Sequence, residues 1–269
     1  MRQPIALVTG ASSGLGAAIA AGLAAAGYRV FGTSRQARGE ALGVRMVQMD
    51  VDDDASVAAA IATILAETGR IDVVVNNAGC GIAGAIEDTT AAEAEAQMST
   101  NFLGTHRVCR AVLPVMRAHQ GGRIVNVSSL AGIIPLPFQA FYSASKFAIE
   151  AYSEALRIEA KPFGVHVSMI EPGDYATGFT AHRRLTAASN ASSPYHARAT
   201  RAIAIMARDE QANADLGPVV RTVLRALSAP RPRLRYPTAT AVQRVLVALK
   251  PFLPDGLVEK LLTATYEAG

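Results

Sequence analysis

A tyrosine and a lysine stand four positions apart in the segment Tyr142-Ser-Ala-Ser-Lys146. On a helix, this spacing places both side chains on the same face. A free phenol has a pKa of about 10, and we expect the neighbouring ammonium to lower it by roughly 1–3 units. A tyrosine tuned in this way can donate a proton to a carbonyl oxygen or accept one from an alcohol. The pair therefore predicts acid/base chemistry at a carbonyl or alcohol carbon.

A serine precedes this pair at the end of an apolar run. Ser129 lies in Asn126-Val-Ser-Ser-Leu-Ala-Gly132, directly after a predicted strand over residues 123–128. The end of a parallel strand lies at the carboxyl edge of its sheet, where ligands bind in such folds. We therefore expect the Ser129 hydroxyl to hold the oxygen of a substrate.

A glycine-rich segment, Thr9-Gly-Ala-Ser-Ser-Gly-Leu-Gly16, separates the first predicted strand from the first predicted helix. Glycines allow a tight turn and a close approach of a phosphate, and the helix N-terminus offers free N–H groups and partial positive charge. The spacing is neither the common dinucleotide fingerprint nor a Walker loop. The segment predicts a phosphate-binding turn, and the alternative is an ordinary strand–helix connection.

The end of the second predicted strand reports on the type of dinucleotide. An acid there would bind the adenosine ribose and repel a 2′-phosphate, but the segment Val30-Phe-Gly-Thr-Ser-Arg35 contains none. Ser34 can donate a hydrogen bond to a phosphate, and Arg35 can add a charge-assisted one. NADP(H) is therefore the predicted cofactor. The alternative is that Arg35 is an ordinary surface arginine.

Strands and helices alternate along most of the chain. We expect strands at residues 5–9, 29–33, 45–49, 72–76, 123–128, 165–170 and 234–236. We expect helices at residues 14–26, 56–68 with Ser56 as cap, 92–118, 143–160, 197–208, 216–228, 239–249 and 255–266. Several of the strands are continuously apolar, as strands buried on both faces are. This alternation predicts an α/β fold: a doubly wound, Rossmann-type parallel sheet with helices on both faces.

The chain contains no repeat and no convincing linker, so we expect one domain over residues 1–269. Residues 174–210 are rich in small, polar and basic residues and predict a flap over the site. The helices within residues 239–266 predict a C-terminal extension.

The composition narrows the classes of function. Half of the residues are hydrophobic, as in a chain with a large core, and the formal net charge is +4. No dense basic run with aromatic residues is present, so we expect no nucleic-acid partner. Two distant cysteines make a disulfide framework improbable. No apolar stretch approaches the roughly 18–20 residues that a membrane span requires. A cytoplasmic protein is therefore predicted.

Taken together, the motifs occur in a characteristic order. The glycine turn, Asn76-Asn-Ala-Gly79, Asn101, Ser129, Tyr142-x-x-x-Lys146 and Pro172-Gly173 follow one another along the chain. This set resembles the classical short-chain dehydrogenase/reductase family over about residues 5–177. The segment 163–173 and the extended C-terminus are similar to the branch that contains hydroxysteroid and retinol dehydrogenases.

The resemblance implies a role for each motif residue. Asn101, Ser129, Tyr142 and Lys146 would be catalytic, with Asn101 holding a helix distortion and a water that links Lys146 to solvent. The residues implied to contact the cofactor are Gly10, Ser12, Ser13, Gly14, Leu15, Gly16, Ser34, Arg35, Asp50, Val51, Asn77, Ala78, Gly79, Tyr142, Lys146, Pro172, Gly173 and Thr177. Asn77 could equally stabilise the sheet. Tyr175 departs from the aliphatic residue that is usual in the family, but that position offers mainly its backbone. No metal is required, because the tyrosine handles the proton.

The predicted function is hydride transfer between NADP(H) and a secondary alcohol or ketone. The apolar segment 133–141 lies between Ser129 and Tyr142 and suggests a hydrophobic substrate wall, although a core or subunit contact would explain it equally well. A non-catalytic NADP(H)-binding sensor or scaffold is the alternative, and it predicts loss of the catalytic residues. A further alternative, an epimerase or dehydratase with tightly held NAD, predicts an acid after the second strand. The helices near residues 103–118 and 143–160 resemble the family's dimer faces, so we expect a homodimer or homotetramer.

Overall fold

The computed structural model describes residues 3–36 and 39–267. In this part of the chain, seven strands run parallel in one sheet, and a two-residue strand, β3 (Glu40–Ala41), pairs antiparallel with β4 at its edge. The parallel strands, in spatial order, are β10 (Arg235–Thr238), β8 (Val165–Pro172), β7 (Gly122–Val127), β5 (Val73–Asn76), β1 (Ile5–Val8), β2 (Arg29–Ser34) and β4 (Val44–Gln48). The order reverses at β1, as in a doubly wound fold.

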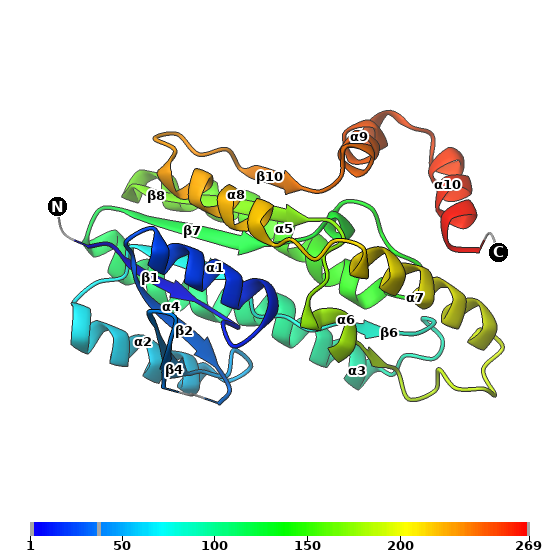
Figure 1. The fold of residues 1–269 in the computed structure, drawn as a ribbon, viewed down its shortest axis with the longest axis horizontal. Coiled ribbons are helices and arrows are strands. Elements are labelled where there is room, and N and C mark those ends of the chain that lie inside the picture. The colour runs from blue at the N-terminus through cyan, green and yellow to red at the C-terminus, as the bar shows by residue number, and fades with distance from the viewer. Residues whose placement is uncertain (1–2, 37–38, 268–269) are drawn as a thin grey trace.

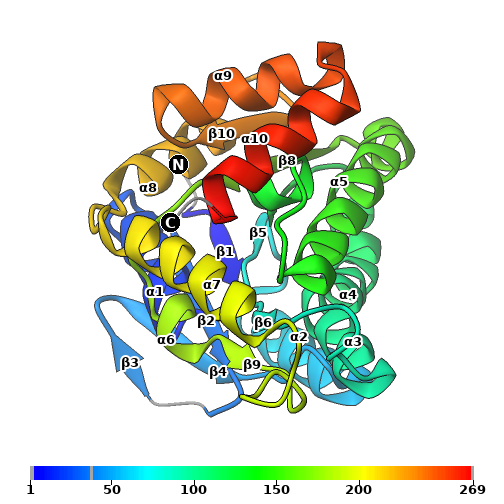
Figure 2. The ribbon, with the colours of Figure 1, turned by 90° about the vertical axis from the view of Figure 1, so that its right-hand side faces the viewer.

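Helices cover both faces of this sheet (Figures 1 and 2). On one face lie α1 (Gly14–Ala25) and α8 (Gly217–Ser228), whose Ile19 and Val223 pack with strand residues in one core cluster. On the other face, α2 (Asp54–Thr68), α4 (Gly104–Ala118) and α5 (Ala140–Ala160) enclose a second cluster with Ile61, Val108 and Leu156. The predicted Rossmann-type architecture is confirmed.

The predicted helix over residues 92–118 is present but is not uniform. It comprises α3 (Ala91–Met98), a π-helical turn η1 (Ser99–Leu103) and α4. A Thr90–Glu93 capping box starts α3. Because π turns recur inside helices at functional sites, the position of Asn101 within η1 agrees with the distortion that the family resemblance implied.

The predicted cap of the second helix was wrong. Helix α2 begins at Asp54, and its cap is Asp53, which accepts hydrogen bonds from Ala55 N and Ser56 N. Ser56 Oγ instead accepts a hydrogen bond from Asp50 N at 2.9 Å. Two cap-forming residue types three positions apart compete for this role, and the first lies in the extended conformation that a cap requires.

The segment that the sequence predicts as a flap, residues 174–210, contains α6 (Gly178–His182), β9 (Arg184–Leu185) and most of α7 (His196–Gln211). Strand β9 pairs in parallel with β6 (Ile82–Ala83), which follows the Asn-Ala-Gly segment. Two further helices, α9 (Ala241–Leu249) and α10 (Asp255–Glu267), form the C-terminal extension. None of the described helices has both the length and the apolarity needed to cross a bilayer.

The register of the sheet gathers the predicted motifs. Val8 is paired with Val75, and Val75 with Val125, while Val127 is paired with Ile170. The residues that follow these positions therefore emerge at the same carboxyl edge. That edge carries the glycine turn, the Asn77 loop, Ser129 and Pro172.

Candidate active site

The glycine turn, which we call the glycine cradle, is packed so closely that side chains do not fit at two of its glycine positions. Gly10 has φ +66°, and a Cβ added there would lie 2.9 Å from Ala78 Cα. A Cβ at Gly16 would lie 2.2 Å from Gly10 O. Side chains at these positions would displace backbone rather than a flexible group, so the glycines are required for the close packing of the turn.

Hydrogen bonds hold the turn against the neighbouring loop. Thr9 Oγ1 accepts hydrogen bonds from Asn77 N and Ala78 N, both at 2.9 Å. Asn77 Nδ2 donates to Thr9 O at 3.0 Å and to Gly10 O at 3.3 Å. The structure thus gives the Asn77 side chain the stabilising role that the sequence left open. Gly79, two residues on, packs against Asn101, whose Oδ1 would lie 3.2 Å from an added Cβ.

Helix α1 presents its N-terminus at this cradle. Its cap, Ser13, has extended backbone and makes no capping hydrogen bond with its side chain, and the first turn contains no acid. The Ser12 and Ser13 side chains are exposed, whereas Leu15 is half-buried. A Cβ at Gly14 would lie 3.4 Å from Thr177 Cβ, so the segment after β8 approaches the same turn. Exposed hydroxyls and a helix N-terminus fit the phosphates of a dinucleotide.

The residues predicted to contact the adenosine end of the cofactor follow β2 and β4. Arg35 is exposed beyond β2, and within the described residues it forms no ion pair. Ser34 Oγ donates a hydrogen bond to Gln36 O. Asp50 Oδ1 accepts a hydrogen bond from Asp52 N at 3.0 Å, and Val51 is buried under Gly104. These residues fit an adenosine, with Arg35 available for a phosphate.

Ser129 and Tyr142 meet at the edge of the sheet. Their hydroxyl groups are hydrogen-bonded to each other, and Ser129 Oγ also accepts from Ala131 N at 3.1 Å. Burial raises the pKa of Tyr142 to about 12, although the bond to Ser129 opposes this. The predicted lowering of this pKa is therefore wrong for this structure, because loss of solvent outweighs the favourable contacts. Tyr142 is consequently a neutral proton donor at physiological pH.

Lys146 lies one helical turn from Tyr142 on α5, as the spacing predicts. Its Nζ is 5.8 Å from the centroid of the Tyr142 ring and donates a hydrogen bond to Val127 O at 2.8 Å. The residue is only 7% exposed. Burial lowers the pKa of Lys146 to about 8, and the charges of Cys80 and Glu150 oppose that effect.

Asn101 connects the π turn to helix α5 through hydrogen bonds. Its Oδ1 accepts from Cys80 N at 2.8 Å, and its Nδ2 donates to Cys80 O and to Ser145 Oγ, both at 3.0 Å. Ser145 Oγ in turn donates to Tyr142 O at 2.7 Å. The side chain of Asn101 therefore fixes the loop after Gly79 relative to Tyr142.

The C-terminal extension packs on the loop after β8. Gly173 N donates to Thr238 O at 3.0 Å, and a Cβ at Gly173 would lie 2.6 Å from Gln243 Oε1. Gln243 Nε2 donates to Asp174 Oδ2. Pro172 ends β8, and Tyr175, which departs from the family pattern, is buried in the core.

Sequence reasoning missed a buried charge cluster behind Lys146. Glu150 Oε2 accepts from Arg235 Nε at 2.8 Å, and Glu171 Oε1 lies 3.3 Å from the same nitrogen. Arg235 also pairs with the exposed Glu154. Burial, and then the charge of Glu150, raises the pKa of Glu171 to about 7. One guanidinium thus serves two buried carboxyl groups, and burial raises the pKa of both above that of an ordinary glutamate.

A second missed group comes from the flap. Arg183, whose side chain is 3% exposed, forms an ion pair with Glu210 of α7, and Thr180 Oγ1 donates to the same carboxylate. The charges of Glu210, Arg183 and Asp174 all act on the Tyr142 phenol. No short-range pattern could have joined these residues, because the two ion-pair partners lie 27 positions apart.

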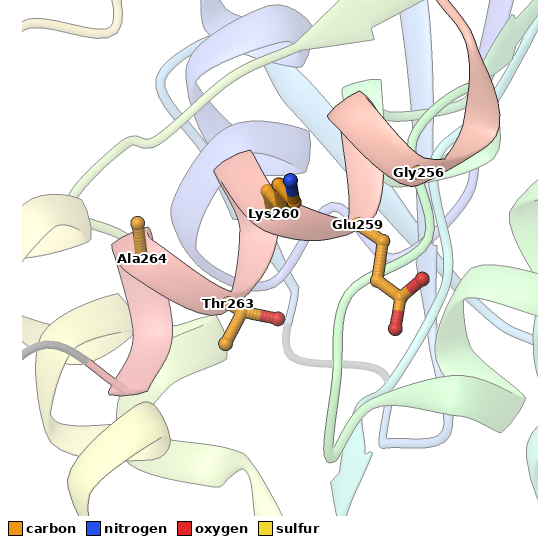
Figure 3. Close-up of a pocket in the computed structure, with 5 residues that line it drawn as sticks. All are labelled: Gly256, Glu259, Lys260, Thr263 and Ala264. Carbon is orange, nitrogen blue, oxygen red and sulfur yellow. The ribbon is translucent and has the colours of Figure 1, made fainter.

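Two hollows lie outside this constellation. One of about 450 Å³ is lined by Gly256, Glu259, Lys260, Thr263 and Ala264 of α10 (Figure 3). Another of about 280 Å³ is lined mainly by apolar residues of α7 together with Leu185 and Ser189. Neither includes Ser129, Tyr142 or Lys146, so the reacting groups and the glycine cradle define the site. No group of three or more potential metal ligands occurs among the described residues.

Comparison with known proteins finds relatives of a single enzyme family. A model of the short chain dehydrogenase family matches residues 4–188. The chain is 39% identical over 266 residues to 3-ketodihydrosphingosine reductase of Bacteroides thetaiotaomicron, covering 99% of each chain. It is 35% identical over 270 residues to bovine retinol dehydrogenase 8, covering 93% of this chain and 86% of the relative.

Solved structures agree with this result. A short-chain dehydrogenase from Streptomyces avermitilis has a TM-score of 0.81 at 31% identity, covering 98% of this chain and 96% of that one. A Burkholderia phymatum protein in complex with NAD shares the fold, with a TM-score of 0.79 at 24% identity and 93% of each chain covered. A metagenomic oxidoreductase in complex with NADP has a TM-score of 0.59 at 35% identity, covering 63% of this chain and 81% of that one.

Proposed function

Since the chain belongs to the short-chain dehydrogenase/reductase family, we propose that it transfers a hydride between NADP(H) and a secondary alcohol or ketone. The observation that carries this proposal is the Ser129–Tyr142 hydroxyl pair beside Lys146, at the same sheet edge as the glycine cradle. A non-catalytic sensor would not need this set of groups. The combination therefore favours an enzyme over the sensor alternative.

Each group of the site has a chemical task in the proposed reaction. The nicotinamide dinucleotide, when bound, exchanges the hydride. Tyr142 Oη holds the proton that the substrate oxygen receives during reduction, because its pKa of about 12 keeps it neutral. The Ser129 hydroxyl orients that oxygen. Lys146, with a pKa of about 8, still carries its ammonium at neutral pH and is placed to support recovery of the Tyr142 proton.

The preference for NADP(H) over NAD(H) rests on the end of β2. Arg35 is exposed and has no carboxylate partner among the described residues, and no acid follows the strand. A free guanidinium favours a 2′-phosphate, whereas an acid at this place would exclude it. Ser34 adds a hydroxyl at the same point.

The substrate class is proposed to be a lipophilic ketone or its alcohol. The apolar segment 133–141 links Ser129 to Tyr142 and borders the reacting groups. Two relatives that are similar over most of their length are named for lipophilic substrates, a 3-keto sphingoid base and retinol. Reduction of a long-chain 3-keto lipid is accordingly the first reaction to test.

Assembly and location complete the proposal. Leu103 of η1, together with Phe147 and Ile158 of α5, carries exposed apolar surface. Such a surface supports a homodimer or homotetramer built on the α4 and α5 faces. Both cysteines, Cys80 and Cys109, are free thiols, which supports a reducing compartment such as the cytoplasm.

The test is NADPH consumption by the purified chain with 3-ketodihydrosphingosine, a retinal, a steroid ketone and small aliphatic and aryl ketones. We expect turnover with lipophilic ketones and little with the small ones. Turnover of small ketones alone would overturn the substrate class. Tight NADPH binding without turnover of any ketone would favour the sensor alternative.

A further inference from the structure

The C-terminal helices expose a continuous set of apolar side chains. None of the nine residues of α9 is buried. We name the following residues the C-terminal apolar surface: Val242, Val245, Leu246, Leu249, Phe252, Leu257 and Leu261, which are 40–82% exposed. The four on α9 recur at the i, i+3, i+4 and i+7 spacing of a single helix face. Half of the exposed large apolar side chains of the described chain thus lie within 20 residues.

Charge is segregated in the same part of the chain. Residues 216–254 contain seven Lys and Arg residues and no Asp or Glu, which leaves 19 basic against 22 acidic residues elsewhere. Arg231, Arg233 and Arg244 are exposed and form no ion pair within the described residues. Exposed positive charge therefore accompanies the apolar surface, on a chain that is otherwise slightly acidic.

The fold places these features on one side of the molecule. β10 is the edge strand of the sheet. Figure 1 shows α9 and the loop that precedes β10 along one margin of the molecule, at opposite ends of the strand, and Figure 2 also shows α9 beyond β10. Arg231 and Arg233 belong to that loop, and Arg244 belongs to α9. Arg231 and Arg233 therefore share this margin with α9, whereas Arg244, two positions from both Val242 and Leu246, projects from the polar face of α9 opposite the apolar stripe.

The two sides of helix α10 differ in polarity, so only one of them contributes to the C-terminal apolar surface. Figure 3 shows Glu259, Lys260 and Thr263, which line a hollow on one side of this helix. Leu257 and Leu261 lie at the other positions of the same turns and are 42% and 43% exposed. Only one side of α10 is therefore suited to an apolar environment.

We propose that this margin binds the surface of an anionic phospholipid bilayer, with α9 lying in the plane of the interface. Apolar residues on one face of a helix with a basic residue on its polar face are typical of interfacial helices, and α9 has this arrangement with Arg244 opposite the apolar stripe. Each basic residue near an anionic surface adds attraction, and the absence of acids from residues 216–254, which include α9, removes repulsion there. Asp255 and Glu259 of α10 lie beyond this stretch. A protein partner of matching shape would not require a stretch of 39 residues without a carboxylate. This inference is independent of the proposed reaction, because lipid binding needs neither cofactor nor substrate.

The experiment is flotation of the full-length protein with vesicles of phosphatidylcholine alone and of equimolar phosphatidylcholine and phosphatidylglycerol. We expect binding to the anionic vesicles that is lost at high salt, and little binding to the neutral ones. Val245→Asp with Leu249→Asp should abolish binding. Arg231→Glu with Arg233→Glu, which leaves the apolar side chains intact, should lower the partition coefficient by about tenfold or more at low salt. Ile86→Asp, at an apolar side chain that is 67% exposed after β6 and outside the C-terminal apolar surface, is the matched control.

Circular dichroism of each variant separates loss of binding from loss of fold, and the arginine pair provides a second test if the α9 variant unfolds. Equal binding to both kinds of vesicle, or binding to neither, would overturn the proposal. The proposal would also be overturned if the wild-type protein bound no vesicles and light scattering gave a smaller oligomer for Val245→Asp/Leu249→Asp than for the wild type. That result would assign the surface to contact with a second copy of the chain.

Discussion

The Lys146 ammonium lies 5.8 Å from the centroid of the Tyr142 ring and is held there by a 2.8 Å hydrogen bond to Val127 O. The lysine is fixed by β7, the strand that ends shortly before Ser129, so the positions of Ser129, Tyr142 and Lys146 all depend on one strand–helix junction. Burial shifts the pKa values of the two residues in opposite directions. It raises the pKa of Tyr142 to about 12 and lowers that of Lys146 to about 8.

The first prediction concerns the pH dependence of ketone reduction. Because the pKa of Lys146 is about 8, its ammonium is lost as the pH rises through that value, and kcat should fall over the same range. Lys146→Met should lower kcat by roughly 100-fold or more and remove this fall of kcat with pH. Lys146→Arg, which keeps its charge, should retain measurable activity, and its kcat should not fall near that pH. A wild-type kcat that stays constant through this range would contradict the assignment.

The second prediction concerns Glu171 and stability. Its pKa of about 7 in the folded chain exceeds the ordinary value of 4.5, so the native state binds this proton more tightly than the unfolded state. Stability from this group is therefore greatest at low pH and falls as the pH rises from about 4.5 to about 7. Glu171→Gln should raise the Tm at about pH 8 and change it little at about pH 5.

The control for this measurement is Glu154→Gln, because Glu154 pairs with the same Arg235 but its side chain is 52% exposed. Thermal unfolding of both variants should show a pH-dependent gain only for Glu171. A Glu171→Gln protein that is less stable than wild type at the higher pH would mean that the carboxylate is ionised and favourably paired.

The third prediction concerns cofactor choice. Arg35→Ala should weaken NADPH binding by about tenfold or more and leave NADH binding nearly unchanged, because only NADPH carries the phosphate that the guanidinium would bind. Fluorescence titration with both cofactors measures this. Arg29→Ala, at the opposite end of β2 where Arg29 pairs with Glu67, should affect neither cofactor. Equal weakening of both by Arg35→Ala would show that Arg35 does not distinguish them.

The fourth prediction concerns the glycine cradle. Gly16→Ala places a Cβ 2.2 Å from Gly10 O, so the turn must open, and we expect a lower Tm and loss of measurable NADPH binding. Gly256→Ala on α10, where an added Cβ meets no atom within 4 Å, should leave both properties unchanged or improve stability slightly. Normal cofactor binding by Gly16→Ala would exclude this turn from the cofactor site.

Much of the site could be predicted because its signals are local. The glycine turn, the Tyr142–Lys146 spacing and the position of Ser129 after a strand each span a few residues, and the parallel topology brings strand ends together. The distorted helix at Asn101 followed from the family resemblance. Helix ends were less certain, because Asp53 and Ser56 are both suitable caps and only the backbone conformation distinguishes them.

The remaining features depend on contacts between distant segments. Glu150 meets Arg235 from 85 positions away, and neither residue belongs to a recognisable motif. The pKa of Tyr142 was predicted in the wrong direction because sequence spacing reveals a neighbouring charge but not the degree of burial. The role of Asn77 also required coordinates, since an amide beside a glycine turn can face either a ligand or the backbone.

The most direct test of the central claim is the turnover of Tyr142→Phe with NADPH and a lipophilic ketone that the wild-type chain reduces. If Tyr142 delivers the proton, kcat should fall by about 100-fold or more, while the Kd for NADPH stays within about twofold of wild type because the ring and its packing are retained. A Tyr142→Phe protein that keeps a substantial share of wild-type kcat would contradict the account.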